Sequence, residues 1–286
     1  MEPIIRNYIK IKRGKKGICN ICRHELELTW DHIPPRSVLF EPDVITNTVF
    51  KGIPSRNDYM REYQSGIKYR TICKNCNGAI IGKNDVVYKK FVCDIIKQLS
   101  EVYENDAYVA LSGQYIIVRV KVNKLLRSIC GHFLAAKETI DDTIIDMHMR
   151  QYVFNNTLKP ESFNVYSWIY PFSNILISRD FTCIGKTQGT HPKGVSSIIA
   201  AYPLAFLISD REEECWIDEL SAYASNNIND EVDIKIHLDT VLCKGSTELK
   251  NSLWPIGVTD GISGAIMVLG GESFTDDSRI GVRKNK

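Results

Sequence analysis

The sequence contains no apolar segment long enough to cross a membrane and no recognisable export signal. Its longest apolar stretch, Ile198 to Ile208, is interrupted by Tyr202 and Pro203. It is also shorter than the roughly 20 residues that a spanning helix needs. The N-terminus carries Glu2 and Arg6 with no apolar run behind them, unlike a secretory signal peptide. We therefore expect a cytoplasmic protein with no membrane partner, in which cysteine thiols stay reduced.

Internal repeats and low-complexity tracts are absent, and two common catalytic motifs are incomplete. Gly185-Lys186-Thr187 resembles the end of a phosphate-binding loop, but Asp180 occupies a position where that loop requires glycine. Ser196 and Ser197 lack the glycines of a nucleophile elbow. The sequence therefore favours neither a P-loop protein nor an α/β-type serine hydrolase.

Charge is unevenly distributed along the chain, although the net charge is only +2. Residues 1–100 contain eighteen Lys and Arg against ten Asp and Glu, whereas residues 101–286 contain eighteen against twenty-four. A local positive field attracts polyanions such as nucleic acid, although an ordinary solvated surface explains the surplus equally well. The most basic segment, residues 10–16, is either a strip that follows a phosphate backbone or a mobile tail. Its candidate nucleic-acid contacts are Lys12, Arg13, Lys15 and Lys16.

Cysteine is plentiful, with nine residues, and four of them form two Cys-x-x-Cys pairs. The pairs are Cys19/Cys22 and Cys73/Cys76, separated by fifty residues, a longer gap than in an ordinary zinc ribbon. Two such pairs in a cytoplasmic chain predict one tetrahedral Zn²⁺ with four thiolate ligands. Because four thiolates leave no open coordination position, this zinc is expected to be structural. The other five, which we interpret as small buried residues, are Cys93, Cys130, Cys183, Cys215 and Cys243.

Hydrophobic periodicity predicts an α+β protein. Apolar residues at three- and four-residue spacing predict a helix from Asp85 to about Tyr103, with Asn84 as its N-cap. We place a domain boundary at Asn105 and Asp106, which divides the chain into residues 1–105 and 106–286. In the second part we expect a strand at 115–122, a helix capped by Asn123, a helix at 141–155, and strands at 163–170, 174–178, 198–208, 232–238 and 265–269. His132 and His148 fall on these helices without a metal-ligand partner at suitable spacing, and we interpret both as core or surface residues.

Candidate catalytic residues lie between and beside the cysteine pairs. Asp31-His32 follows Cys22 by nine residues and precedes Ile33-Pro34-Pro35, which excludes a helix there. Asn77 directly follows Cys76, so a bound zinc would fix its position. Carboxylate and amide oxygens suit a hard cation such as Mg²⁺ or Mn²⁺, and a neutral His32 could remove a proton from water. Together, these three groups would make a one-metal phosphodiesterase.

The run Thr-x-Asp-His-Ile-Pro-Pro-x-Ser-x-Leu-Phe between Cys-x-x-Cys and Cys-x-x-Cys-Asn resembles the HNH endonuclease family, the ββα-metal nucleases, and most closely its zinc-bearing bacterial branch. The resemblance covers about Ile18 to Asp94. It implies that Asp31 and Asn77 bind the catalytic metal and that His32 is the general base. It also implies a β-hairpin from about Thr29 to Tyr59 and a helix starting near Cys73.

One residue departs from the family pattern. The middle Asn of the family would stand a few residues before Cys73, where this chain has Ile67 to Ile72 without an Asn. Thr71 or a backbone group is then left to orient the catalytic loop. Arg36 and Arg70 are candidate phosphate contacts, or else ordinary surface arginines.

The sequence thus predicts a zinc-stapled ββα-metal module in residues 1–105, followed by a mixed α+β domain in residues 106–286. The expected function is metal-dependent hydrolysis of phosphodiester bonds in double-stranded DNA, with RNA as a second substrate to test. Family members joined to a sensor or partner-binding domain often act in antiviral defence, which is a fold-level analogy here. Residues 106–286 could bind a nucleotide signal, a protein partner or a second copy of the chain. The alternative is a non-catalytic zinc module that binds nucleic acid or protein.

Overall fold

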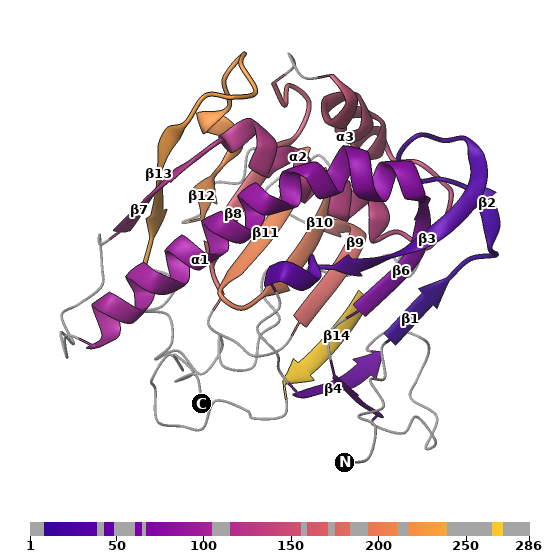
Figure 1. Cartoon of the computed structure of the whole chain (residues 1–286), viewed down its shortest axis with the longest axis horizontal. Helices are drawn as coiled ribbons and strands as arrows, with labels where there is room; N and C mark the ends of the chain where they lie inside the picture. Colours follow the sequence, from indigo (N-terminus) through magenta and orange to yellow (C-terminus); the bar gives the residue numbers. More distant parts are fainter. Residues whose placement is uncertain are drawn as a thin grey trace, which may run out of the picture.

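A computed structural model describes residues 9–38, 43–48, 61–64, 67–104, 115–155, 159–170, 175–183, 194–210, 217–238 and 265–270. These residues form a mixed α+β fold with three α-helices and three β-sheets (Figure 1). The helices are α1 (Lys83–Glu104), α2 (Val122–Ala135) and α3 (Ile144–Phe154). The strands are β1 (Ile9–Lys12), β2 (Lys16–Ile18), β3 (Glu25–Ile33), β4 (Asp43–Thr48), β5 (Arg61–Gln64), β6 (Ile67–Cys73), β7 (Tyr115–Val120), β8 (Asn164–Ile169), β9 (Ile175–Cys183), β10 (Gly194–Ala201), β11 (Leu204–Ser209), β12 (Asp218–Glu219), β13 (Val232–His237) and β14 (Ala265–Gly270).

The smallest and largest sheets both combine segments that are far apart in the sequence. An eight-stranded sheet has the order β12-β8-β11-β10-β9-β14-β4-β5, so that β4 lies beside β14 from the C-terminal part of the chain (Figure 1), and β5 pairs with the other edge of β4. A four-stranded sheet, β1-β6-β3-β2, here called the small sheet, carries both cysteine pairs at one end, and a two-stranded sheet joins β7 to β13. The largest cluster of buried apolar side chains contains residues from both sides of the predicted boundary at 105/106. The experiments below therefore use the full-length chain.

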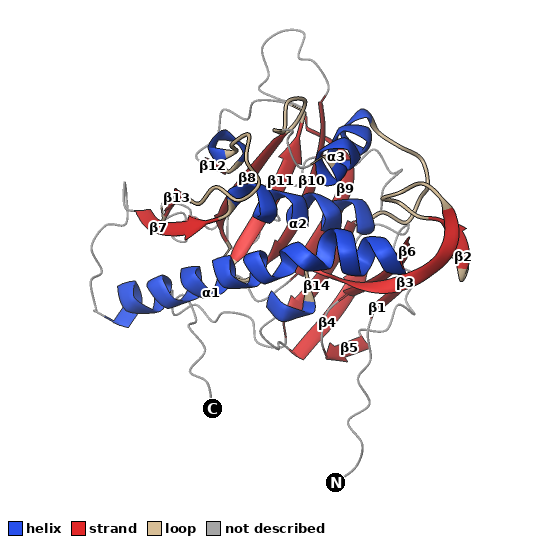
Figure 2. Ribbon diagram, turned by 45° about the horizontal axis from the view of Figure 1, so that its top comes forward, coloured by secondary structure: helices blue, strands red, loops and turns tan. Residues whose placement is uncertain are grey.

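Helix α2 lies at the centre of the fold, between the other helices and one face of the large sheet (Figure 2). Nearly every residue of this helix is buried, as expected for a helix enclosed on all sides. Even Arg127 is 1% exposed. Its guanidinium donates to the carbonyl oxygens of Asn123 and Asn155 and lies 4.4 Å from the ring centre of Tyr152. The buried charge of Arg127 is therefore stabilised by two carbonyl oxygens and an aromatic ring.

The helix after the second cysteine pair begins earlier than the sequence predicted. It starts at Lys74, close to where the family resemblance placed it, and passes through a π-helical turn, Cys76–Gly82, into α1. Asn84 is therefore inside the helix, and its amide donates to the carbonyl oxygen of Ile80 instead of capping an N-terminus. The N-cap prediction for Asn84 was wrong because the helix has no end at that point.

Gly131 allows this π-helical turn to pack closely against α2. A Cβ built on Gly131 would lie 2.7 Å from Cγ1 of Ile81, which is itself 1% exposed and has no room to move. We expect Gly131→Ala to lower the free energy of unfolding by roughly 1–3 kcal/mol through overpacking. Chemical denaturation measures this change.

The matched control is Gly78→Ala, at a helical glycine with no atom within 4 Å of the added Cβ. Alanine is the better helix former, so this variant should gain roughly 0.5–1 kcal/mol. Equal stability of the two variants would show that the contact with Ile81 is not tight.

Most elements predicted for the second part are present, with two corrections. Asn123 lies inside α2 rather than at its N-cap, and its amide donates to the carbonyl oxygens of Ser225 and Asn227. The predicted strand at 198–208 is instead a hairpin of β10 and β11, in which Ala201 pairs with Leu204. Among the unpaired cysteines, Cys130 is buried as predicted, whereas Cys93 is exposed on α1.

The N-terminal strands also differ from the predictions. Both ends of the basic segment 10–16 lie in strands, β1 and β2, rather than in a mobile tail, and β1 pairs in parallel with β6. Within the described residues, β3 pairs with β6 over Leu28–Ile33; Tyr59, where the predicted hairpin would end, lies outside them. Asn105 and Asp106 also lie outside the described residues, as does the segment 185–187.

Candidate functional site

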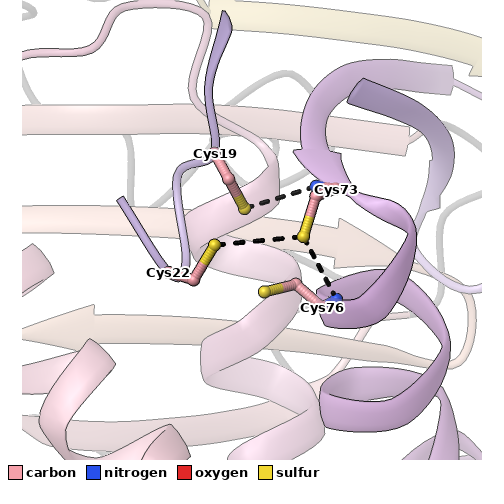
Figure 3. Close-up of side chains that lie close together, drawn as sticks. All are labelled: Cys19, Cys22, Cys73 and Cys76. Carbon is pink, nitrogen blue, oxygen red and sulfur yellow. Dashed lines mark hydrogen bonds between the residues drawn. The ribbon is translucent and has the colours of Figure 1, made fainter. Parts of the chain in front are cut away.

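The two cysteine pairs meet at one end of the small sheet. Cys19 and Cys22 lie in the turn between β2 and β3, Cys73 ends β6, and Cys76 begins the π-helical turn, with all four side chains directed toward one another (Figure 3). The turn closes through a hydrogen bond from the Arg23 N–H to the Cys19 carbonyl oxygen. A positive φ of 62° at Arg23 then directs the chain back into β3.

The four sulfur atoms form a group that can hold a metal ion such as zinc. They all lie within 4.8 Å of one another, and Sγ of Cys22 is 3.9 Å from Sγ of Cys73. A tetrahedral zinc with Zn–S bonds of about 2.3 Å requires sulfur–sulfur separations of about 3.8 Å. Within the described residues, no other cluster of His, Cys, Asp and Glu has metal-binding spacing.

Hydrogen bonds already favour a thiolate in this group. A hydrogen bond from Cys76 and backbone N–H groups outweigh the effect of burial and lower the pKa of Cys19 to about 4. The pKa of Cys76 is raised, chiefly because its thiol donates to Cys19. Burial raises the pKa of Cys22 as well. Without a cation, a thiolate at Cys19 therefore disfavours ionisation of Cys76. A bound divalent cation would let all four cysteines be thiolates, because coordinated thiols are deprotonated.

The cysteine turn is anchored to the C-terminal end of α2. The Asn20 amide donates to the carbonyl oxygens of Leu134 and Lys137 at 2.9 and 2.7 Å, and Thr71 Oγ1 donates to that of Ala135 at 2.5 Å. Carbonyl groups at the end of a helix have no partner within the helix, so these side chains satisfy groups that would otherwise be buried unpaired. The cysteine group is thereby coupled to the central helix of the fold.

Asp31 and His32 occupy adjacent positions on β3 opposite Tyr69 and Lys68 of β6. Because adjacent side chains on a strand point to opposite faces, Asp31 faces the core and His32 faces away from it. Asp31 is 7% exposed, whereas His32 is partly exposed. Burial lowers the pKa of His32, and the nearby cations lower it further against the opposing effect of Asp31, to about 4. Its ring is therefore neutral at neutral pH.

Asn77 lies beside this part of β3. Its amide nitrogen donates to the Trp30 carbonyl oxygen at 2.9 Å and to Thr29 Oγ1 at 3.2 Å. Within the described part of the chain, β2 is the only strand on this edge of β3, and it pairs only with residues 25–27. Asn77 therefore reaches this edge of β3 at Trp30, and no described strand pairs with the edge from there to Ile33, which is called the open edge of β3 below. The structure thus brings Asn77 next to the residue that precedes Asp31.

The carboxylate of Asp31 has a partner that the sequence did not reveal. His132 of α2 lies with Nδ1 3.1 Å from Oδ2 of Asp31 and with Nε2 3.0 Å from Oδ1 of Asp85. Ser128 Oγ donates to the same oxygen of Asp85 at 2.6 Å. Burial alone lowers the pKa of His132, but the two carboxylates outweigh burial and raise it to about 10. Both ring nitrogens therefore donate, and the ring is an imidazolium.

The arginines and lysines predicted to contact nucleic acid differ in their contacts and in their exposure. Arg13 donates to Asn20 Oδ1 and the Thr71 carbonyl oxygen, while Arg70 donates to the Arg13 carbonyl oxygen and lies 5.1 Å from the ring centre of Trp30. Both hold the small sheet together. Of the other predicted contacts, Lys15 forms an exposed ion pair with Glu27, Lys16 and Arg36 are exposed, and Lys12 lies in β1 opposite Arg70.

Comparisons with known proteins found no match among protein-family models, curated proteins or solved structures. None of the helices in the described ranges is long and apolar enough to cross a membrane.

Proposed function

We propose that this protein is a metal-dependent HNH endonuclease that hydrolyses phosphodiester bonds in double-stranded DNA. The observation that supports the proposal most is the hydrogen bond between the Asn77 amide and the carbonyl oxygen of Trp30, the residue that directly precedes Asp31 and His32. The antiparallel pair β3–β6 and the following helix have the strand–strand–helix order that the family resemblance implies. Four close thiols bracket this unit and would hold a structural Zn²⁺.

The open edge of β3 accounts for how Asp31 and His32 could act on one phosphate although they lie on opposite faces. A ligand at a strand edge can approach side chains of both faces. Asp31 and Asn77 would hold Mg²⁺ or Mn²⁺ there through their side-chain oxygens, and this ion would polarise the scissile phosphate and stabilise the leaving oxygen. His32 would accept the proton of the attacking water. The Asn77 amide must turn its oxygen toward the ion for this role.

Positive side chains near His32 suit a polyanionic substrate. Arg36 and Lys68 are close enough to His32 to lower its pKa, and Lys68 pairs with His32 across β3 and β6. In the register of β1 and β6, Lys10 aligns with Lys68 and Lys12 with Arg70. Cationic groups along neighbouring strands attract a phosphate backbone without regard to base sequence.

A second candidate function is supported by the position of Asp31 itself. Its side chain is 9% exposed and one oxygen is committed to His132. In addition, the sequence has no Asn in the six residues before Cys73. A zinc module that binds nucleic acid without cutting it would have these features. Roles in antiviral defence and in partner binding through residues 106–286 stay predictions from the sequence.

One experiment separates the two functions. Full-length, zinc-containing protein is incubated with duplex DNA, single-stranded DNA and RNA, each with Mg²⁺, Mn²⁺ or EDTA, and the products are examined on denaturing and native gels. The nuclease requires strand cleavage that EDTA abolishes. A shift of the intact duplex without cleavage in either metal would establish the binding module instead.

A further inference from the structure

The contact between Asp31 and His132 joins two parts of the chain that are 101 residues apart in sequence. The side chain of His132 is 3% exposed, that of Asp31 is 9% exposed, and that of Asp85, at the far side of the ring, is 25% exposed. The arrangement therefore extends from the more exposed start of α1, through the last turn of α2, to the candidate site on β3. Ser128, one turn before His132 in α2, donates to Asp85 and fixes the outer carboxylate.

Stability alone does not account for these three groups. Burying charged side chains carries a desolvation cost that often cancels their mutual attraction, and apolar residues of similar size frequently pack as well or better. The geometry shows a more specific arrangement. Oδ2 of Asp31 contacts His132, whereas Oδ1 accepts no hydrogen bond from the described part of the chain.

We propose that His132 is a positioning residue for Asp31, fixing the carboxylate so that its Oδ1 is presented to a divalent cation at the open edge of β3. This inference rests on the proposed function, because it assigns Asp31 to the catalytic metal. Asp85 and Ser128 hold the His132 ring in place from the opposite side. Removing a side chain that hydrogen-bonds to a metal ligand typically weakens metal affinity or activity by about 10- to 100-fold.

Two substitutions of His132 distinguish positioning from mere packing. The amide nitrogen of Asn lies near the position of Nδ1 of histidine, so His132→Asn can keep the donor to Asp31. The longer Gln places its amide nitrogen near Nε2, so His132→Gln keeps the donor to Asp85 and loses the one to Asp31. Both variants remove the same charge and leave a polar amide in the core. They should therefore lose similar stability but keep opposite contacts, Asn the one with Asp31 and Gln the one with Asp85.

The test measures Mn²⁺ binding to full-length, zinc-containing protein without nucleic acid, using the electron paramagnetic resonance signal of free Mn²⁺. Asp31→Ala identifies the binding that depends on Asp31. We expect the dissociation constant to rise about 10- to 100-fold in His132→Gln and to change by less than about 3-fold in His132→Asn. Equal constants for the two variants, or no Asp31-dependent binding in the wild-type protein, would overturn the proposal.

Asp85→Asn provides a second test if the substitutions in α2 prevent folding, because Asp85 is more exposed. It should raise the Mn²⁺ dissociation constant several-fold, and an unchanged constant would also refute the positioning role. Cleavage assays on the same preparations keep the two proposals apart. If Mn²⁺ binding depends on Asp31 and His132 as expected while DNA stays intact, the positioning role holds and the nuclease assignment fails.

Discussion

Cys19→Ser is expected to yield protein without zinc and with a cooperative loss of structure in the small sheet and in α2. The three remaining thiols cannot complete a tetrahedral site, and structural zinc sites contribute about 10–16 kcal/mol of apparent binding free energy in zinc-finger peptides. The loss should extend beyond the cysteines, because Asn20, the residue after Cys19, donates to two carbonyl oxygens at the end of α2. Zinc content by mass spectrometry and thermal melting by circular dichroism measure both effects.

Cys93→Ser is the matched control for this substitution. Cys93 is exposed on α1 and lies outside the four-thiol group, so its replacement should change neither zinc content nor melting temperature. If Cys19→Ser retained one zinc per chain and melted like the wild-type protein, the four thiols would not form the predicted structural site.

His32→Ala is expected to reduce DNA cleavage by about 10²- to 10⁴-fold, the usual contribution of a general base. His32 is partly exposed and lies on the face of β3 away from the core, so its loss should leave zinc content and melting temperature close to wild type. Binding of duplex DNA should also persist, because the cationic side chains around it remain. Initial rates of plasmid nicking, measured beside a gel-shift assay, separate catalysis from binding.

His24→Ala is the corresponding control, because His24 is an exposed histidine directly before β3, the strand that carries His32. It should cut DNA at the wild-type rate. Undiminished cleavage by His32→Ala would remove His32 from the mechanism, and an equal loss in both variants would indicate damage to the module rather than to the base.

Local sequence patterns predicted the elements of this fold better than their ends. Helices α2 and α3 and strands β8, β13 and β14 were predicted because their apolar residues follow the periods of helix and strand. The N-cap assignments failed at Asn84 and Asn123 because an asparagine amide can also donate to carbonyl oxygens from within a helix. The hairpin of β10 and β11 was missed because both strands are apolar and its turn contains only two residues.

Most contacts between segments that are distant in the sequence could not be predicted from it. The cysteine spacing predicted the four-thiol group because the metal-binding pattern is itself local to each pair. Nothing local indicates that β3 pairs with β6, or that His132 lies between Asp31 and Asp85. In the sequence, the one available sign was that His132 falls on the apolar face of a predicted helix. An ionisable side chain buried there, as His132 is, needs charged or hydrogen-bonding partners.

The most direct test of the central claim is the rate at which full-length, zinc-containing protein nicks supercoiled plasmid as Mn²⁺ is increased. We expect no nicking in EDTA and a rate that saturates with Mn²⁺ in the wild-type protein. We also expect Asp31→Ala and Asn77→Ala to need much more Mn²⁺ to reach half of their maximal rates. Intact plasmid at every Mn²⁺ concentration, or the same Mn²⁺ dependence in all three proteins, would contradict a catalytic metal held at the open edge of β3.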